Sequence, residues 1–521
     1  MALVATACLI APGDPGPADV VLSINTAKGV AAIDDAIYGS NTASRLGPDS
    51  LGAVRLGGNR WTAYNWENNA SNAGTDWCSQ NDGFLSGSST PGAAVLPTVT
   101  AARDAGATAI VTVPIVDVVA ADKNGGSGPP ACSGDVRNSG ANYLTTRFRQ
   151  NVAATVGALP GAPNAGDATV TQDQFAAWLA TAAPGTDTVF SLDNEPDLWS
   201  STHPAIHPAA VTYAELLERT LRFSTALKHV RPDAEVAGPV SYGFNGFETL
   251  QGAPDRAGKG NFVEWYLAQL AAADATAGFR HVDYLDLHWY PEARGAGTRI
   301  TGTETSPAVV AARVQAPRSL WDPTYLEDSW ITTDYGYGPI RLLPRMQEKI
   351  AAHNPGTKLA VTEWNYGGGG HISGAVATAD VLGTFGVQGV GLATYWELHG
   401  DESYARAAFR AYRNYDGAGA AFGDRSAEAT SSNVAATSVY ASTRTGDPTK
   451  VIVVAVNRST TPKQAAIAVT HGKKLTTGRA FRIAAGSAQV VPAGTVTPVA
   501  QNAFNETLPA MSVTVFELSA A

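Results

Sequence analysis

The sequence predicts an α/β protein: a (β/α)8 TIM barrel with an additional antiparallel β-sandwich domain. Short apolar runs rich in β-branched residues alternate with helix-period segments eight times between residues 36 and 396. After about residue 401, short β-type runs are separated by Gly, Pro, Thr and Asn, and we find no segment of helical period. A chain of 521 residues has room for both domains.

The barrel strands are expected in chain order, each followed by a polar or Gly-containing segment. Helical patterns such as those at residues 171–182, 213–229 and 262–272 separate them. The eight expected strands cover residues 36–40, 54–58, 109–116, 188–192, 235–240, 283–289, 358–362 and 390–396. We expect residues 34–402 to form the barrel and 403–521 the sandwich, with strands from 20–33 joining it. Residues 1–19 are expected to be a signal remnant or a disordered N-terminus.

Composition excludes several partners. The net charge of −10 argues against a nucleic-acid partner, because polyphosphate would be repelled. No apolar run approaches the roughly 20 residues of a membrane span. The apolar, small-residue N-terminus suggests a secreted protein, and we expect a monomer. Cys8 would then be lost on maturation, leaving Cys78 and Cys132 to pair; three unpaired thiols are the alternative.

Two glutamates follow predicted strands. Glu195 comes after the apolar run 188–192, between Asn194 and Pro196, and the proline stops the strand there. Glu363 closes the apolar run 358–362 in the same way. A surface glutamate in a loop is the alternative for each. Two strand-end carboxyls at one barrel mouth are typical of retaining glycoside hydrolysis, with the groups about 5–5.5 Å apart. We expect the pKa of Glu195 to be raised, chiefly by the charge of Glu363, with burial adding to it.

Other strand ends carry polar and aromatic side chains suited to sugars. Arg55 could orient Glu363, Asn194 could bind a 2-hydroxyl, Tyr290 could hydrogen-bond Glu363, and Trp396 could form a platform. For each, a packed barrel residue is the alternative, and for the aromatics after strand two the alternative is a small core under a loop. The predicted substrate-binding residues are Arg55, Asn59, Trp61, Tyr64, Trp66, Asn194, His288, Trp289, Tyr290, Trp364, Tyr366 and Trp396.

Acidic residues near the Gly-rich segment 124–128 could hold a metal. Glu67, Asp122 and Asp135 are the predicted ligands of a structural Ca²⁺, which takes oxygens from acidic loops. Their spacing does not match an EF-hand, and a solvated acidic loop is the alternative. No cofactor is expected to be required for the chemistry.

Three stretches together resemble glycoside hydrolase family 44. They are Gly57-Gly58-Asn59-Arg60 with the segment 64–70, Ser191-Leu192-Asp193-Asn194-Glu195-Pro196-Asp197-Leu198-Trp199, and Thr362-Glu363-Trp364-Asn365-Tyr366. The resemblance runs from about residue 20 to the C-terminus. It implies a barrel with a β-sandwich and retaining endo-β-1,4-glucanase activity, with Glu195 as acid/base and Glu363 as nucleophile. It also implies plant cell-wall substrates such as cellulose, carboxymethylcellulose, mixed-linkage glucan, xyloglucan or xylan, and commonly bound calcium.

Two other functions fit parts of the pattern. An exo-acting arabinofuranosidase or xylosidase also pairs an Asn-Glu strand end with a later Glu on a barrel with a sandwich. A non-catalytic carbohydrate-binding protein is the second alternative. Abundant Trp and Tyr near several strand ends favour an endo-acting enzyme, and two strand-end glutamates favour catalysis. The sequence does not rank the candidate polymers.

Overall fold

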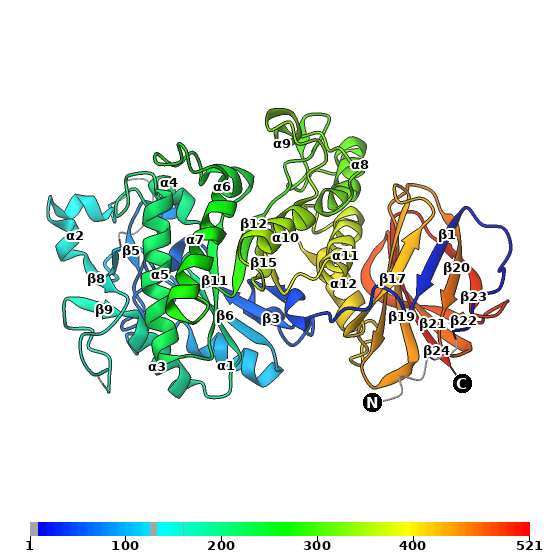
Figure 1. Cartoon of the computed structure of the whole chain (residues 1–521), viewed down its shortest axis with the longest axis horizontal. Helices are drawn as coiled ribbons and strands as arrows, with labels where there is room; N and C mark the ends of the chain where they lie inside the picture. The colour runs from blue at the N-terminus through cyan, green and yellow to red at the C-terminus, as the bar shows by residue number, and fades with distance from the viewer. Residues whose placement is uncertain (1–8, 126–132, 160, 521) are drawn as a thin grey trace.

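A computed structural model describes residues 9–125, 133–159 and 161–520, folded as a barrel beside a β-sandwich (Figure 1). Eight parallel strands close the barrel, and all eight correspond to predicted strands. In chain order they are β2 (Gly39–Ser40), β3 (Ala53–Leu56), β6 (Thr108–Val113), β10 (Thr188–Leu192), β11 (Glu235–Ser241), β12 (Tyr284–Trp289), β15 (Lys358–Trp364) and β16 (Leu392–Tyr395).

Helices surround the barrel; most bury one apolar face, and one, residues 372–387, is buried on all sides. In α5 (Tyr213–Val230), Leu216, Phe223 and Leu227 are buried at helical spacing, and the Thr212 hydroxyl accepts the N–H of Glu215 as an N-cap. The other long helices are α1 (Leu96–Ala105), α3 (Gln172–Ala182), α7 (Phe262–Ala277), α8 (Pro307–Gln315), α10 (Leu342–His353), α11 (Ile372–Val387) and α12 (Ser403–Arg413). Short helices lie in the loops: α2 (Tyr143–Thr146), α4 (Trp199–Thr202), α6 (Phe244–Thr249) and α9 (Trp330–Asp334).

The barrel interior changes from apolar to polar along its axis. One residue on or just before each barrel strand contributes to a mostly apolar layer that closes one end of the barrel. These residues are Ala36, Ala53, Ile110, Val189, Ala237, Tyr284, Ala360 and Leu392. Side chains two positions further along a strand point inward again, and several are polar: Arg55, Ser191, Asp286 and Thr362. The hydroxyl of Thr362 donates to Asp286 at 2.8 Å. The barrel is therefore closed by hydrocarbon at one end and polar towards the carboxyl ends of its strands.

The sandwich is formed by strands from both ends of the chain. Strand β1 (Val20–Asn25) lies in the sandwich sheet, where it pairs antiparallel to β17 (Arg425–Ser431) and parallel to β20 (Lys463–Thr470). Residues 9–19 run along it, since the N–H of Ile10 donates to the carbonyl of His471. The remaining strands are β18 (Thr437–Arg444), β19 (Asp447–Asn457), β21 (Leu475–Ala484), β22 (Ser487–Val496), β23 (Ala503–Leu508) and β24 (Ser512–Ala520).

The prediction of no helix beyond residue 401 was wrong, because α12 covers Ser403–Arg413. The segment does carry a helical period: Arg406, Arg410 and Arg413 recur along one side, while Ala405, Ala408 and Tyr412 are buried on the other, so the signal was present in the sequence. Together with α11, α12 lies between the barrel and the sandwich. Because it follows β16 directly, we infer that the barrel domain extends to about residue 413.

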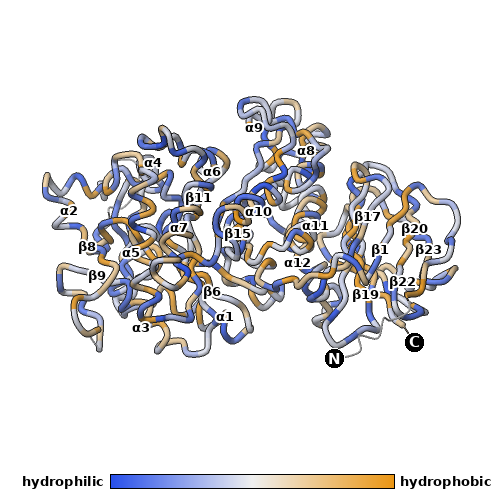
Figure 2. The backbone as a smooth tube through the Cα atoms, viewed as in Figure 1, coloured by the Kyte–Doolittle hydropathy of each residue, from blue (hydrophilic) through white to orange (hydrophobic). Residues whose placement is uncertain are grey.

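A buried ion pair joins the two domains. Asp380 on α11 accepts hydrogen bonds from Arg458 Nη2 at 2.6 Å and from the hydroxyl of Tyr440 at 2.6 Å, and both members of the ion pair are fully buried. Strand β19 is apolar on both faces: Val451 and Val453 face the sandwich core, while Val454 and Val456 pack towards the barrel helices. Figure 2 shows this hydrophobic character along the strands of both domains. The domains therefore pack through a continuous core.

Candidate active site

Glu195 follows β10 in an unusual backbone conformation. Its φ of 45° and ψ of 56° are left-handed, a region that non-glycine residues rarely occupy. The N–H of Glu195 donates to the carbonyl of Val240 at 3.0 Å, and Pro196 then opens the short 3-10 helix Pro196–Leu198. Such strain, on the order of 1–3 kcal/mol, persists where surrounding contacts impose it and gathers at functional sites. It directs the carboxyl group over the barrel mouth.

Glu363 lies on β15, the facing strand, and its carboxylate accepts hydrogen bonds from two side chains of other strand ends. Arg55 Nη1 donates to Oε1 at 2.8 Å, and the hydroxyl of Tyr290 donates to Oε2 at 2.8 Å. The Arg55 side chain is fully buried in the barrel. Charge-assisted bonds of this kind stabilise an ionised carboxylate. The expected partners of Glu363, Arg55 and Tyr290, are therefore both in place.

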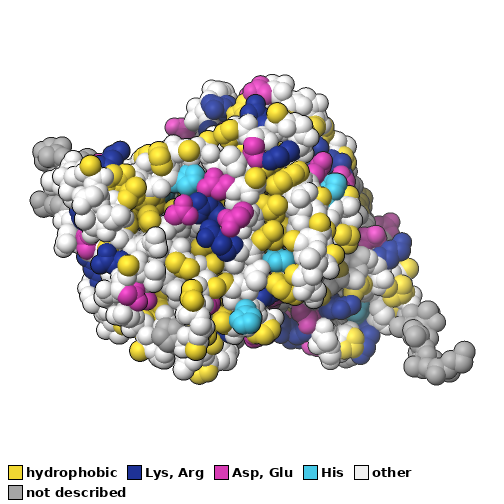
Figure 3. Space-filling model, turned by 60° about the vertical axis from the view of Figure 1, so that its left-hand side comes forward, with side chains coloured by type: hydrophobic (Ala, Val, Ile, Leu, Met, Phe, Trp, Pro, Cys, Tyr) yellow, Lys and Arg dark blue, Asp and Glu magenta, His cyan; other side chains and the backbone are white. Residues whose placement is uncertain are grey.

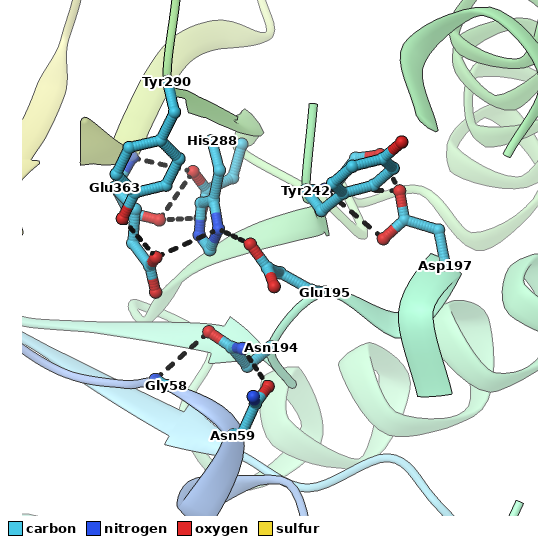
Figure 4. Close-up of polar contacts among 12 residues, drawn as sticks. Gly58, Asn59, Asn194, Glu195, Asp197, Tyr242, His288, Tyr290 and Glu363 are labelled. Atoms are coloured by element: carbon cyan, nitrogen blue, oxygen red, sulfur yellow. Dashed lines mark hydrogen bonds and ion pairs between the residues drawn. The ribbon is translucent and has the colours of Figure 1, made fainter. Parts of the chain in front are cut away.

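The two carboxyl groups lie close together (Figure 4). One oxygen of Glu195, one oxygen of Glu363 and one ring nitrogen of His288 all lie within 4.8 Å of one another. His288 Nδ1 is 2.8 Å from Glu195 Oε1 and 3.5 Å from Glu363 Oε2. Inverting glycosidases need roughly 6.5–9.5 Å between the carboxyls to admit a water molecule, whereas retaining enzymes keep about 5–5.5 Å. The separation here fits the retaining arrangement.

Burial sets the protonation of Glu195. It raises the pKa of Glu195 to about 7, while the positive charge of Arg55 lowers that pKa and the negative charge of Asp76 raises it further. We expected the charge of Glu363 to be the main cause, and this was wrong. Arg55 lies 2.8 Å from Glu363, and its positive charge offsets that carboxylate as seen from Glu195.

Asn194 connects the two sides of the site. Its Oδ1 accepts from Arg55 Nη2 at 2.8 Å and from the N–H of Gly58 at 3.1 Å. Its Nδ2 donates to Asn59 Oδ1 at 3.3 Å, and Asn59 Nδ2 donates to Asp76 at 3.0 Å. The amide of Asn194 is thus fixed in orientation beside Glu195, and Asn59 lies on the rim.

A cleft of about 310 Å³ adjoins Glu195. Its lining includes Tyr242, Phe244, Trp289, Tyr290 and Trp330. On the other side of the site, the ring of Trp396 lies against Gly58, where an added Cβ would be 2.7 Å from Cη2. Both aromatic and polar groups therefore surround the paired carboxyls, as sugar binding requires.

Several predicted substrate-binding aromatics are core residues instead. Tyr64, Trp66, Trp364 and Tyr366 are at most 1% exposed, so a sugar ring cannot stack on them. Trp66 packs against Phe175, and Tyr366 accepts from Trp289 Nε1 at 3.1 Å. Trp61 is 6% exposed and packs edge-on to Tyr64, so little of its ring is open to a sugar. Aromatic residues near strand ends serve the long loops of this barrel as well as its cleft.

The three predicted calcium ligands are not brought together. Asp122 pairs with Arg147 at 2.7 Å and Asp135 with Arg137 at 2.6 Å, so their charges are already neutralised. Glu67 differs: it is buried, no arginine or lysine is bonded to it in the described ranges, and its pKa is raised to about 7 by burial and by Asp167. Of this set, only Glu67 has the character of a cation ligand.

Only one of the two cysteines of the predicted disulfide is among the residues that the structure describes. Cys78 is disulfide-bonded. Its predicted partner, Cys132, lies outside the residues that the structure describes.

Three site residues were not singled out from the sequence. Tyr242 lines the cleft immediately after β11, and the strand-end rule would have found it had the strand been extended by one residue. The buried carboxyl of Asp197 accepts from the N–H of Tyr242 at 3.2 Å, and burial raises its pKa to about 7. Trp330 belongs to a long excursion after β12, where no strand-end signal exists.

Two close carboxyls at the mouth of an eight-stranded parallel barrel, beside an aromatic cleft, define a glycoside hydrolase. Residues 70–293 match the family model described as glycoside hydrolase family 44. The chain is 39% identical over 514 residues to Endoglucanase A of Paenibacillus lautus, covering 95% of this chain and 72% of that protein. It is 38% identical to Beta-mannanase/endoglucanase A of Caldicellulosiruptor saccharolyticus, covering 94% of this chain and 38% of that protein.

A solved structure is similar over its whole length. The family 44 xyloglucanase of Paenibacillus polymyxa, solved with xyloglucan, superposes with a TM-score of 0.90 at 36% identity, covering 96% of this chain and all of that one. The chain belongs to glycoside hydrolase family 44. It is a glycoside hydrolase with endoglucanase activity, and enzymes of this family need no cofactor for the chemistry.

The position of Arg55 depends on Gly57, and this generates a prediction. A Cβ at residue 57 would lie 2.2 Å from Arg55 Cζ, so Gly57→Ala must displace the guanidinium. We expect kcat/KM to fall by about 10²-fold, because a shift near 1 Å in a positioned group has that effect. The melting temperature should change far less.

Gly47→Ala is the matched control, since nothing lies within 4 Å of its added Cβ. Kinetics and thermal unfolding of both variants check the prediction. Wild-type kcat/KM in Gly57→Ala would show that the placement of Arg55 is not critical.

Proposed function

We propose that this enzyme cleaves internal β-1,4 linkages of glucan backbones with net retention, using Glu195 as acid/base and Glu363 as nucleophile. The close approach of the two carboxyls, within 4.8 Å between oxygens, is the observation that supports it most. The contrasting surroundings add to it, because Glu363 has two strong donors. Glu195 is only 15% exposed and has no cationic partner in direct contact among the described residues.

In the first step the protonated carboxyl of Glu195 gives its proton to the departing glycosidic oxygen. The ionised carboxylate of Glu363 attacks the anomeric carbon and forms a glycosyl ester, while the bond to the leaving oxygen breaks. Arg55 and Tyr290 hold the attacking carboxylate in place. Asn194, fixed by Arg55 and Gly58, lies where it can hydrogen-bond a hydroxyl of the reacting sugar.

In the second step Glu195, now ionised, removes a proton from water as the water attacks the anomeric carbon. The ester bond to Glu363 breaks and its carboxylate is restored. Two inversions at the same carbon give a product with the original anomeric configuration.

The substrate is a neutral β-glucan in this proposal. Related enzymes are named for endoglucanase, xyloglucanase and mannanase activities. An open cleft lined by Tyr242, Phe244 and Trp330 suits a chain that enters and leaves on both sides of the carboxyl pair, as endo action requires. On the face shown in Figure 3, acidic and basic side chains are interspersed, so no single-sign patch there would select a charged polymer.

We also propose that the enzyme acts outside the cell, as a monomer, on plant cell-wall polysaccharide. Polymers of this kind do not enter cells, so the enzyme has to meet them outside. In the parts of the chain that the structure describes, none of the helices has both the length and the apolar character needed to cross a bilayer.

Removing the nucleophile tests the mechanism directly. Glu363→Gln should lower turnover by several orders of magnitude while the fold persists, because an amide cannot act as an anionic nucleophile. Azide should partly restore cleavage of an aryl cellobioside with inverted product, whereas wild-type enzyme gives retained product. Near-normal activity in Glu363→Gln, or inverted product from wild type, would contradict the proposal.

The raised pKa of Glu195 predicts the basic limb of the pH profile. Glu195 must carry its proton in the free enzyme, so kcat/KM should fall as the pH rises through about 7. In Glu195→Ala, assayed with a leaving group that needs no proton, this limb should disappear. A limb that survives unchanged in Glu195→Ala would assign it to another group.

A panel of polymers tests the substrate class. We expect cleavage of carboxymethylcellulose, mixed-linkage glucan and xyloglucan, with a rapid fall in viscosity relative to reducing ends released. Xylan and mannan should be weaker substrates because their backbone sugars differ from glucose. Release of single sugars from chain ends without a fall in viscosity would exclude endo action.

Structural calcium remains a proposal, centred on Glu67 beside Asp167. We expect EGTA to lower the melting temperature of the wild type, since a ligand at 100 times its Kd stabilises by about 2.7 kcal/mol. Glu67→Gln should abolish that sensitivity. Asp122→Asn, whose carboxylate is bonded to Arg147, should keep it. Identical melting curves with and without EGTA would count against bound calcium.

A further inference from the structure

His288 lies between the two carboxyls, and its role goes beyond substrate contact. It points into the barrel from β12 and is fully buried. Nδ1 lies 2.8 Å from Glu195 Oε1 and 3.5 Å from Glu363 Oε2 (Figure 4). In the described part of the chain, Nε2 has no hydrogen-bond partner. One ring nitrogen therefore faces both reacting carboxyls, and the other faces none.

These contacts determine which nitrogen carries the hydrogen. Burial lowers the pKa of His288 to about 4, so the ring is neutral and carries one N–H. A lone pair on Nδ1 would face the carboxylate lone pairs of Glu363, which is repulsive. A hydrogen on Nε2 would be a buried donor without an acceptor, which is rarer and more costly than an unmatched lone pair. The hydrogen therefore belongs on Nδ1.

We propose that His288 is a positioning residue that donates Nδ1–H to Glu195 Oε1, so that the acid proton of Glu195 resides on Oε2 and the ionised form is stabilised in the second step. This rests on the proposed role of Glu195 as acid/base. With Oε1 occupied as an acceptor, only Oε2 is left to carry the proton towards a glycosidic oxygen. When Glu195 becomes the base, the same donor stabilises its negative charge.

Removal of the donor should therefore raise the pKa of Glu195. In His288→Leu, which fills the space without a donor, the basic limb of kcat/KM should move upward by about one to two pH units. In His288→Asn, whose amide places an N–H near the position of Nδ1, the limb should stay close to wild type. The other titratable groups facing this pair remain in both variants: Arg55, Asp76, Asp197, Asp286, Tyr290 and Glu363.

A second readout separates this role from simple support of the fold. With an aryl cellobioside whose leaving group needs no acid, the second step limits kcat. We expect kcat for His288→Leu to fall by about tenfold near neutral pH while kcat/KM changes little, because Glu195 is then a largely protonated base. A general loss of structure would lower both parameters and leave the limb in place.

Failure of the role proposed for His288 can be told apart from failure of the acid/base role proposed for Glu195. A basic limb that vanishes in Glu195→Ala but does not move, or moves downward, in His288→Leu would overturn the role of His288 alone. A limb that survives in Glu195→Ala would overturn the acid assignment itself.

A measurement on the unaltered protein covers the case in which His288→Leu does not fold. The ¹⁵N shifts of the ring, assigned by their absence in His288→Asn, report the tautomer among the nine histidines. Nδ1–H supports the proposal, and Nε2–H overturns it.

Discussion

The contact between Arg55 and Glu363 is the interaction on which the rest of the site depends. The guanidinium is buried inside the barrel and also bonds Asn41 at 3.2 Å and Asn194 at 2.8 Å. It thereby ties the ends of β2, β10 and β15 together. A buried cation without its carboxylate would cost several kcal/mol, so the nucleophile's charge contributes to stability as well as to the chemistry. Gly57 has no side chain because this guanidinium occupies the space.

One physical condition, burial, gives the three central groups different protonation states. Glu363 accepts hydrogen bonds from Arg55 and Tyr290, and such donors favour a carboxylate. Glu195 lacks such a partner, and burial raises its pKa towards neutrality. His288 is buried too, and the same penalty keeps its ring neutral. An acid, an anion and a neutral donor therefore coexist within a few ångströms. The apolar barrel floor beneath them keeps water from the site's lower side.

The strands and the two glutamates were predictable because they obey local rules. An apolar run ended by Asn194, Glu195 and Pro196 is a strand with its end marked, and β15 repeats the pattern. Features that depend on packing were not predictable. Trp66 and Trp364 have the same composition signal as cleft aromatics, yet the long loops and α11 bury them. Trp330 reaches the cleft from a distant excursion that carries no strand-end signal.

The cause of the raised pKa also explains how Glu195 changes role during the reaction. Burial alone would keep it protonated in both steps. In the free enzyme the charge of Arg55 is largely offset by Glu363, its partner at 2.8 Å. Once Glu363 is esterified it carries no charge, and Arg55 then acts on Glu195 without compensation. The positive charge favours the ionised form, so Glu195 loses its proton when a base is required. The charge that changes is that of Glu363, and the unchanged charge of Arg55 favours ionised Glu195 once no carboxylate counters it.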